Sequence, residues 1–272
     1  MPELPEVQEV RRTLEPFVLH VPIVDVMVLR KNYIRSGAAT IKNLIGRRVS
    51  HTVRHGKKLF CIFDDLQVLL LHLGMSGCIE CCQRDIPRRP HTHFALVLAT
   101  GLEMRMHDPR RFGGVWHYAT WPSAEKAQIT GKLGVDALDV TAAHFVTWRN
   151  MRGRLKAQLL SQRTVAGLGN IYVDESLWMA KLHPRQILSK IRPDQKEALA
   201  QSIRMVLNKS ISMGGTTLRD YRNVAQQQGR FARSLCVYGR AGLPCPRCGK
   251  ALISEVISGR TTVFCARCQR RN

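Results

Sequence analysis

The sequence has no uninterrupted apolar run of roughly 18 residues, the least that a membrane-spanning helix needs. Its acidic, proline-containing start also lacks the basic and apolar regions of a secretory signal peptide. It has no internal repeat and no low-complexity tract. From these absences we expect no membrane-spanning helix, no signal peptide and no repeat array. We therefore expect a cytoplasmic protein without a membrane partner.

Acidic residues are scarce: the 272 residues include 20 Asp and Glu against 42 Lys and Arg, a net charge of 42 − 20 = +22. The basic residues are spread along the chain and are not gathered in a tail. Such a charge predicts a polyanionic partner, most simply a nucleic acid, with an anionic membrane surface as the alternative. The length favours two domains, and the hydrophobic content of 44% is enough for their cores.

The cysteines number nine, an odd count, and four of them have metal-site spacing, so a reducing compartment fits better than a disulfide scaffold. Cys245 and Cys248 form one C-x2-C pair, and Cys265 and Cys268 form a second pair after sixteen intervening residues. This is the spacing of a tetrahedral four-cysteine zinc site. Because cysteine fills every position, the predicted zinc is structural, and we expect no catalytic metal and no organic cofactor.

Short β-branched or apolar runs between Gly, Pro and Asp breaks predict an antiparallel β-sandwich in the first half. The expected strands are Ile23–Leu29, Arg48–Val53, Leu59–Phe63, Val68–Leu73, Phe94–Leu98 and Glu103–His107. A helix over residues 3–15, ended by Pro16, precedes them. The second half is helical and is followed by an alternating hairpin between the cysteine pairs, so the fold class is α+β.

Four segments follow from these patterns. We expect an N-terminal β-sandwich domain at 1–120, a linker at 121–140, a helical domain at 141–230 and a zinc finger at 231–272. The helical domain ends in a polar loop, Thr216–Gly229, and loops of that length tend to be functional or disordered.

The start of the chain, Pro2-Glu3-Leu4-Pro5-Glu6, has two interpretations. Removal of Met1 before the small Pro2 leaves a secondary amine, which is partly neutral at neutral pH and can attack a carbonyl carbon. Glu3 lies beside it and can move protons. The alternative is a plain helix start, because Pro5 and acidic residues are ordinary in a first turn.

Three breaks between the expected strands are polar and basic. Lys57 lies in the first, where a solvated turn is the plainer interpretation. Met75 lies on a glycine-flanked turn, and Arg110, Arg111 and Phe112 form the tip of a third loop. Arginine binds phosphate or a base edge, and an apolar side chain wedges between bases, so the third loop predicts DNA contact.

Two further clusters have both structural and functional interpretations. His91 and His93 follow three cysteines, Cys78, Cys81 and Cys82. This group fits either a metal site or core cysteines, and a phosphate contact by His91 is the more economical function. The turn ending in Asn170 opens an apolar helical run, and such a helix start either binds phosphate or is merely structural.

Together these segments resemble the bacterial formamidopyrimidine-DNA glycosylase family, essentially from end to end. The similarity rests on Pro2–Glu6, Leu73–Gly77, His91–His93, Asp108–Gly113, Gly167–Tyr172, Gly214–Leu218, Val237–Arg240 and the four-cysteine finger. It implies an N-terminal β-sandwich, a helix–two-turns–helix DNA-binding domain and a C-terminal zinc finger. It also implies a base excision repair enzyme that acts, as a monomer, on double-stranded DNA containing oxidised bases or abasic sites.

The resemblance implies a bifunctional DNA glycosylase and abasic-site lyase. Pro2 would form a Schiff base with the sugar of an oxidised purine, such as 8-oxoguanine or a formamidopyrimidine, and Glu3 would carry protons. Successive β- and δ-elimination would then cut the strand. Lys57 and Arg260 match family positions in this catalytic group, whereas Lys58 stands where an aromatic residue is commoner.

The resemblance also assigns DNA contacts. Met75, Arg110 and Phe112 match the residues that fill the gap left by an extruded base. Further matched positions are Glu6, His91 and Asn170, the last two as phosphate contacts. The chain departs from a lysine-rich family pattern at 151–156, where Arg152 and Lys156 are the favoured phosphate contacts.

Two other functions share part of this pattern. A glycosylase of endonuclease VIII type, which removes oxidised pyrimidines, has the same nucleophile and finger. Leu4, the His91–His93 segment, the arginine-rich loop and the long 216–229 loop favour the purine-lesion enzyme. A zinc-finger DNA-binding protein without catalysis also fits the basic surface.

Overall fold

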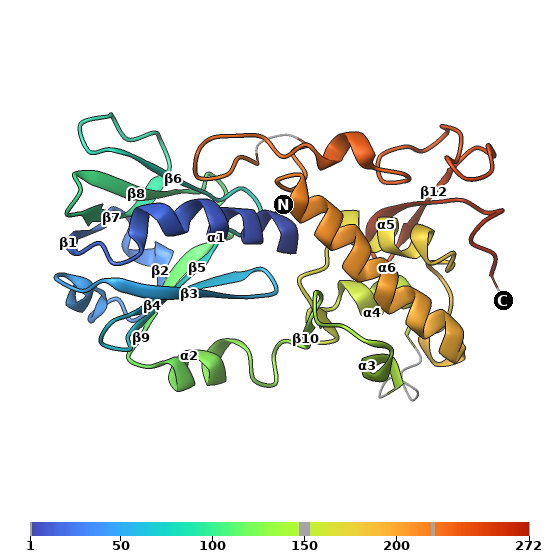
Figure 1. The fold of residues 1–272 in the computed structure, drawn as a ribbon, viewed down its shortest axis with the longest axis horizontal. Helices are drawn as coiled ribbons and strands as arrows, with labels where there is room; N and C mark the ends of the chain where they lie inside the picture. Colours follow the sequence, from blue (N-terminus) through green and yellow to red (C-terminus); the bar gives the residue numbers. More distant parts are fainter. Residues whose placement is uncertain (1, 147–152, 219–220, 272) are drawn as a thin grey trace. The chain divides into compact units, whose positions relative to one another are not determined.

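The computed structural model describes residues 2–146, 153–218 and 221–271. The chain forms two compact units (Figure 1). The N-terminal unit comprises Met1–Gly131 and Met213–Arg230, and the C-terminal unit comprises Lys132–Ser212 and Phe231–Asn272. The segment Met213–Arg230 therefore groups with the N-terminal unit, although it lies within the 141–230 range predicted for the helical domain. No helix in the described ranges is long and apolar enough to cross a membrane.

Helix α1 (Leu4–Val18) opens the N-terminal unit, and its apolar face is buried as the spacing predicts. The helix passes through Pro16, where the sequence predicts its end. Pro16 removes only one donor in the last turn, and the amide of Leu19 still bonds the carbonyl of Glu15 at 3.0 Å. Burial of Val18 favours the extra residues of helix.

Two sheets form a β-sandwich. The first has the order β1-β7-β8-β6 and consists of β1 (Ile23–Val28), β7 (Thr92–Leu98), β8 (Leu102–His107) and β6 (Cys78–Gln83). The second has the order β2-β9-β5-β4-β3 and consists of β2 (Ile34–Ser36), β9 (Gly114–Tyr118), β5 (Val68–His72), β4 (Lys58–Phe63) and β3 (Val49–His55). All pairs are antiparallel except β2 with β9. The six predicted strands are confirmed; β2, β6 and β9 had no clear sequence signal, and β6 is rich in cysteine.

The core of this unit lies between α1 and the two sheets. It includes Val10 of α1, Phe63 of β4, Phe94 of β7 and Met106 of β8, all almost without exposed surface. Close packing of these side chains fixes the helix on the sandwich. The N-terminal end of α1 is thereby held in one position within the unit.

Two connections cross between the sheets at the same end of the sandwich. Residues 73–77 lead from β5 to β6, and residues 108–113 lead from β8 to β9. Strands β5 and β9 are neighbours in one sheet, and β6 and β8 are neighbours in the other. The two connections therefore run side by side with opposite chain directions. They are called the first and second crossing connections below.

Helix α2 (Trp121–Gln128) lies where the sequence predicts the beginning of a linker. A capping box starts it at Thr120, Ala124 is fully buried, and the rings of Trp121 and Phe60 meet edge-on at 5.2 Å. The first part of the expected linker thus belongs to the N-terminal unit, because an apolar helix face covers the sandwich.

The C-terminal unit combines helices with small sheets. Its helices are α3 (Ala142–Val146), α4 (Leu155–Leu160), α5 (Asn170–Met179) and α6 (Pro193–Ser212). Its strands are the parallel pair β10 (Val135–Asp136) and β11 (Val165–Ala166) and the antiparallel hairpin β12 (Ile253–Ile257) and β13 (Arg260–Phe264). The described residues also form short 3-10 turns, η1 (Lys31–Tyr33) and η2 (Ile41–Leu44) in the N-terminal unit and η3 (Leu188–Lys190) and η4 (Phe231–Ser234) in the C-terminal unit. These elements confirm the predicted α+β class.

Helix α5 is the centre of the C-terminal unit. It is buried on almost every side, and its Trp178 shares an apolar cluster with Val237, Leu252 and Val263 of the finger segment. The helix nevertheless carries two acids, Asp174 and Glu175, which are buried as well. Buried carboxylates need partners inside the protein, and those partners connect α5 to the finger.

Candidate catalytic and DNA-binding residues

The start of α1 is a closed hydrogen-bonded cap. Glu3 is the N-cap residue, and the Glu6 carboxylate accepts its amide at 2.8 Å in a capping box. The other oxygen of Glu6 accepts the amide of Thr216 at 2.7 Å. Pro2, Glu3 and Glu6 are all buried. The structure therefore brings Pro2 to a helix N-terminus beside two buried carboxylates.

The segment Met213–Arg230 is fastened to α1 by side chains of its polar loop. The Tyr221 hydroxyl donates to the Glu6 carbonyl at 3.2 Å, and the Asn223 side-chain amide donates to the Glu9 carboxylate at 3.2 Å. Burial, followed by the nearby carboxylates of Glu6 and Glu9, raises the pKa of Tyr221, so its hydroxyl stays a donor. In its described part, the predicted polar loop is thus bonded to the helix that begins at the cap.

The two crossing connections carry Met75 and the arginine-rich tip. Met75 and Phe112 are 41% and 57% exposed, and the Arg110 guanidinium lies 4.8 Å from the centroid of the Phe112 ring. Gly74 has a φ of +60°, and a Cβ on it would come within 2.3 Å of the nitrogen of Gly113. Only glycine allows the connections to touch in this way. The structure thus brings the three expected wedge residues onto adjoining loops.

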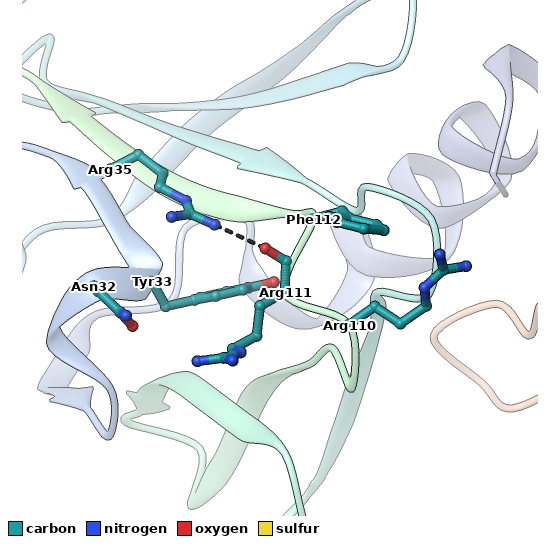
Figure 2. A pocket seen from close by; sticks show the side chains of 6 residues that line it. All are labelled: Asn32, Tyr33, Arg35, Arg110, Arg111 and Phe112. Atoms are coloured by element: carbon teal, nitrogen blue, oxygen red, sulfur yellow. Dashed lines mark hydrogen bonds between the residues drawn. The ribbon is translucent and has the colours of Figure 1, made fainter.

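Figure 2 shows that Arg110 and Arg111 leave the loop in different directions. Arg111 has a left-handed φ of 56°, and its carbonyl accepts a bond from Arg35 at 2.8 Å. A pocket of about 290 Å³ opens beside this bond, and none of its lining residues is acidic. The pocket is lined by Asn32, Tyr33, Arg35, Arg110, Arg111 and Phe112. Its arginines make it suitable for an anionic group.

His91 and His93 occupy different environments, although an extended segment would point both to one face. His93 is buried and donates from Nε2 to the Asp108 carbonyl at 2.9 Å, whereas His91 is exposed. The left-handed φ of His91, 68°, breaks the extended geometry. Burial is the main cause that lowers the pKa of His93, which keeps this ring neutral. Of the two histidines, His91 is the one open to solvent.

The cysteines at 78–82 form part of β6 and not a metal site. Cys81 packs against the sandwich core, and burial raises its pKa to about 12. Within the described ranges, the finger cysteines are the only group of histidine, cysteine and acidic side chains close enough to hold a metal ion. The structure therefore supports the core interpretation of this cluster.

Lys57 lies in the turn of the β3–β4 hairpin. Its neighbour Lys58 donates to the backbone carbonyl and the side-chain oxygen of Gln128 at 2.8 and 2.6 Å, at the end of α2. Burial first, and then the charges of Lys58 and Lys57, lower the pKa of His72 to about 4. The neutral His72 accepts the amide of Gly74 at 2.8 Å. Both lysines thus lie within electrostatic reach of the first crossing connection.

Asn170 is bonded to β13, the second strand of the finger hairpin, which begins with Arg260. Asn170 is the first residue of α5, and its side-chain amide donates to the carbonyl of Thr261 at 2.9 Å. Ser258 and Gly259 have φ values of 53° and 71°, as a two-residue hairpin turn requires. The next residue, Arg260, is exposed. Asn170, a predicted phosphate contact, is therefore bonded to the residue that follows Arg260, the predicted catalytic arginine.

Lys156 is not positioned for the phosphate contact expected from the sequence. It has no exposed side-chain surface, and its Nζ lies 2.6 Å from Oδ1 of Asp174. It also donates to the Thr261 carbonyl at 3.4 Å. The cause is that Lys156 belongs to the buried side of α4, with Leu155 and Leu159, and this helix packs against α5, which carries Asp174. The other residue favoured for this contact, Arg152, lies outside the described residues.

Glu175 has a structural role that the sequence does not reveal. Its carboxylate accepts three backbone amides, those of Cys236, Val237 and Tyr238, each at 2.9 Å. Burial raises the pKa of Glu175, and these bonds partly offset that effect. The available signal was two adjacent acids in an otherwise apolar helix, which predicts buried partners without naming them.

The four finger cysteines converge as their spacing predicts. Their sulfur atoms all lie within 4.8 Å of one another, with 3.5 Å between those of Cys248 and Cys265. Tetrahedral zinc with Zn–S bonds of about 2.3 Å places sulfurs about 3.8 Å apart. The indole of Trp178 donates to the Cys245 sulfur at 3.5 Å, a contact that orients this ligand. The group fits a structural zinc.

Family models match most of the chain. The N-terminal domain of formamidopyrimidine-DNA glycosylase matches residues 1–115, and the H2TH domain of the same enzyme matches residues 133–222. A zinc finger found in FPG and IleRS matches residues 242–271. The chain belongs to the formamidopyrimidine-DNA glycosylase family. Glycosylase activity in base excision repair, the abasic-site lyase activity that is part of the family, and the structural zinc follow from this membership.

Relatives along the whole chain agree with the formamidopyrimidine-DNA glycosylase assignment. The enzymes so named from Teredinibacter turnerae and Methylococcus capsulatus are 41% and 39% identical, each over 99% of this chain and 100% of the relative. Lactococcus lactis Fpg in complex with abasic-site DNA has a TM-score of 0.92 at 32% identity. MutM in complex with DNA containing carbocyclic 8-oxo-G has a TM-score of 0.91 at 31% identity. Each match covers 99% of this chain and 100% of the other.

Proposed function

We propose that the chain excises oxidised purines from double-stranded DNA and then cuts the strand at the resulting abasic site. The observation that carries the proposal is the buried cap at the start of α1, in which Glu3 and Glu6 lie beside Pro2. Support for the substrate class comes from similar proteins, whose complexes contain Fapy-dG, carbocyclic 8-oxo-G or an abasic site.

Pro2 acts as the nucleophile once Met1 has been removed. Its nitrogen bonds to C1′ of the damaged nucleotide while the bond from C1′ to the base breaks, and the departing base takes up a proton. Opening of the sugar ring then gives an iminium, which acidifies the hydrogen on C2′. Loss of that proton expels the 3′ phosphate, and a second elimination expels the 5′ phosphate.

Glu3 is the proton carrier of these steps. Glu3 is 2% exposed and its amide is held by Glu6 at 2.8 Å, so it has a fixed position next to the nucleophile. A fixed acid–base group within reach of the reacting atoms is what proton transfer in the transition state requires. Glu6 contributes by holding this position, and it also faces the damaged base together with the 216–229 loop.

Met75, Arg110 and Phe112 fill the gap that an extruded nucleotide leaves in the duplex. Two of the three are large apolar side chains that remain exposed on adjoining loops, and the third is an arginine stacked on the Phe112 ring. Extrusion costs stacking energy, and inserted side chains recover part of it. Arg110 in addition can bond the edge of the base left unpaired.

Lys57, His91, Asn170 and Arg260 bind phosphates of the damaged strand. The formal charge of +22 supports this role, since phosphate contacts dominate the affinity of DNA-binding proteins. Arg260 has the further task of gripping a phosphate during the second elimination. Arg152 remains a predicted phosphate contact.

Borohydride trapping on abasic DNA tests the nucleophile. Borohydride reduces the iminium to a stable amine, so the protein should become linked to the DNA. Reductive methylation of the Pro2 amine should abolish the adduct and spare most of the binding. A protein that binds abasic DNA but gives no adduct, with Met1 removed, would be a DNA-binding protein without this chemistry.

Competition between two lesions tests the substrate class. Duplexes with 8-oxoguanine and with thymine glycol are offered together, and we expect faster excision of the oxidised guanine. A preference for thymine glycol would replace the proposal with the endonuclease VIII type. If both lesions gave the same trapping efficiency, the result would support the Schiff-base chemistry but would contradict a preference for oxidised purines.

A further inference from the structure

Asp108 joins the two crossing connections through a fully buried carboxylate. Its Oδ1 accepts the hydroxyl of Ser76 at 2.6 Å, and its Oδ2 accepts the amide of Gly113 at 2.8 Å. Ser76 follows Met75 in the chain, and Gly113 follows Phe112. One carboxylate is therefore bonded directly beside an exposed wedge residue on each connection.

Ser76 completes the link from the other side. Its hydroxyl also accepts the amide of Arg110 at 3.2 Å, so it both donates to and accepts from the second connection. The backbone of Asp108 is fixed in turn: its amide bonds the His91 carbonyl at 3.0 Å, and its carbonyl accepts from His93. The pair Ser76–Asp108 is thus a clip between the two connections, which also approach each other closely where Gly74 meets the backbone of Phe112 and Gly113.

We propose that Ser76 and Asp108 are positioning residues that hold Met75, Arg110 and Phe112 as one preassembled wedge. The inference rests on the function proposed above for those three side chains. Loops that were ordered only on the DNA would lose conformational entropy at each insertion, and a clip made in the free protein avoids that loss. Neither clip residue needs to touch the DNA for this role.

The test compares the same lesion in two settings. In a fully paired duplex the enzyme must extrude the damaged base, whereas in an unpaired bubble it is already unstacked. Ser76→Ala should lower single-turnover excision from the duplex by about 10-fold, the factor expected for one hydrogen bond of this kind, and should leave excision from the bubble nearly unchanged. Ser76→Thr, which keeps the hydroxyl, should restore most of the rate.

Ser50→Ala is the matched control. The Ser50 hydroxyl donates to the Ile62 carbonyl at 3.0 Å in the same unit and lies on β3, away from both connections. It should not change the ratio of duplex to bubble excision. Asp108→Asn is a second variant, expected to act in the same direction as Ser76→Ala. A loss that is equal on both substrates and accompanies a lower unfolding midpoint would overturn the inference in favour of a purely structural role.

A double-mutant cycle with Met75→Ala separates the clip from the wedge. The inference predicts that Ser76→Ala has a smaller effect on duplex excision once Met75 is absent, because only Arg110 and Phe112 then remain to be positioned. If Met75→Ala alone leaves duplex excision unchanged, the proposed wedge function fails. If Met75→Ala slows duplex excision while Ser76→Ala does not, or if the two losses multiply, the wedge stands and the clip is overturned.

Discussion

Lys156 and Asp174 form an ion pair with 2.6 Å between Nζ and Oδ1 and with 0% and 1% exposed side-chain surface. The other oxygen of Asp174 accepts the amide of Val263 at 3.1 Å, and Lys156 also donates to the Thr261 carbonyl. The pair thus ties α4 and α5 to β13, the strand that begins with Arg260. A lysine expected at the DNA surface instead stabilises the strand that presents the finger arginine.

Lys156→Met should destabilise the C-terminal unit by about 3–5 kcal/mol, because it leaves Asp174 buried without its cation. Burial raises the pKa of Asp174 to about 6 even beside Lys156, so without the lysine this carboxyl should take up a proton more readily. The loss should therefore be smaller in mildly acidic than in mildly alkaline solution. Urea unfolding followed by tryptophan fluorescence measures it.

Two further variants test whether the loss of stability in Lys156→Met comes from the buried, unpaired charge. Lys156→Met combined with Asp174→Leu removes both charges and should recover much of the stability. Arg192→Met is the control, since Arg192 pairs with Asp194 at the surface with 60% and 67% exposure and should change little. If Lys156→Met and Arg192→Met lowered the unfolding free energy equally, burial would not be the reason why the Lys156–Asp174 pair matters.

Gly215→Ala should disturb the hydrogen-bonded cap at the start of α1, where we propose that the reaction takes place. Gly215 has a φ of +84°, and a Cβ there would lie 3.0 Å from Oε1 of Glu6, the oxygen that accepts the Thr216 amide. We expect a loss of about 1–3 kcal/mol in unfolding free energy together with slower borohydride trapping. Gly46→Ala is matched in backbone strain, because its φ is +83° and nothing lies within 4 Å of the added Cβ. Equal trapping rates in the two variants would show that the contact with Glu6 is unimportant.

Local patterns predicted a large part of this fold. Short apolar runs between Gly, Pro and Asp breaks predicted the six strands, and the spacing of the cysteines predicted the zinc group. The proline and acidic residues at the start of the chain predicted the helix N-terminus at which Pro2, Glu3 and Glu6 lie. Each of these patterns can be read within one short segment of the sequence or from a fixed spacing between residues. Pairing in the strands then follows from short connections, as in the hairpin of β3 and β4.

The bonds that hold the site together join residues far apart in the sequence, and no local pattern announces them. Ser76 and Asp108 are separated by 32 positions, and Glu175 and Cys236 by 61. The same holds for Glu6, whose carboxylate reaches the amide of Thr216 over 210 positions. These hydrogen bonds form where helices and strands pack together and bury polar side chains. The sequence predicts each helix or strand separately, but it does not predict how they pack against one another.

Removal of zinc should unfold the finger and weaken DNA binding. Cys248→Ser removes one of four converging ligands, and the hairpin that carries Arg260 depends on that group for its fold. We expect loss of bound zinc and a drop of about 10-fold in DNA affinity at physiological salt, measured by metal analysis and fluorescence anisotropy. Cys236→Ser, a half-buried cysteine outside the zinc group, is the control. Unchanged affinity after complete zinc loss would remove the finger from the binding surface.

His72 should stay neutral far below the usual range of histidine. Burial, then Lys58 and Lys57, lower its pKa from 6.5 to about 4, and its neutral Nδ1 accepts the Gly74 amide. Because the folded pKa lies below the unfolded value, the stability that His72 contributes is present above about 6.5 and is lost as the pH falls through about 4. In NMR titrations, the His72 ring and the Gly74 amide should shift together with a midpoint near 4. Lys58→Met should raise that midpoint, and the exposed Lys126→Met should not; a native midpoint near 6.5 would contradict the neutral acceptor.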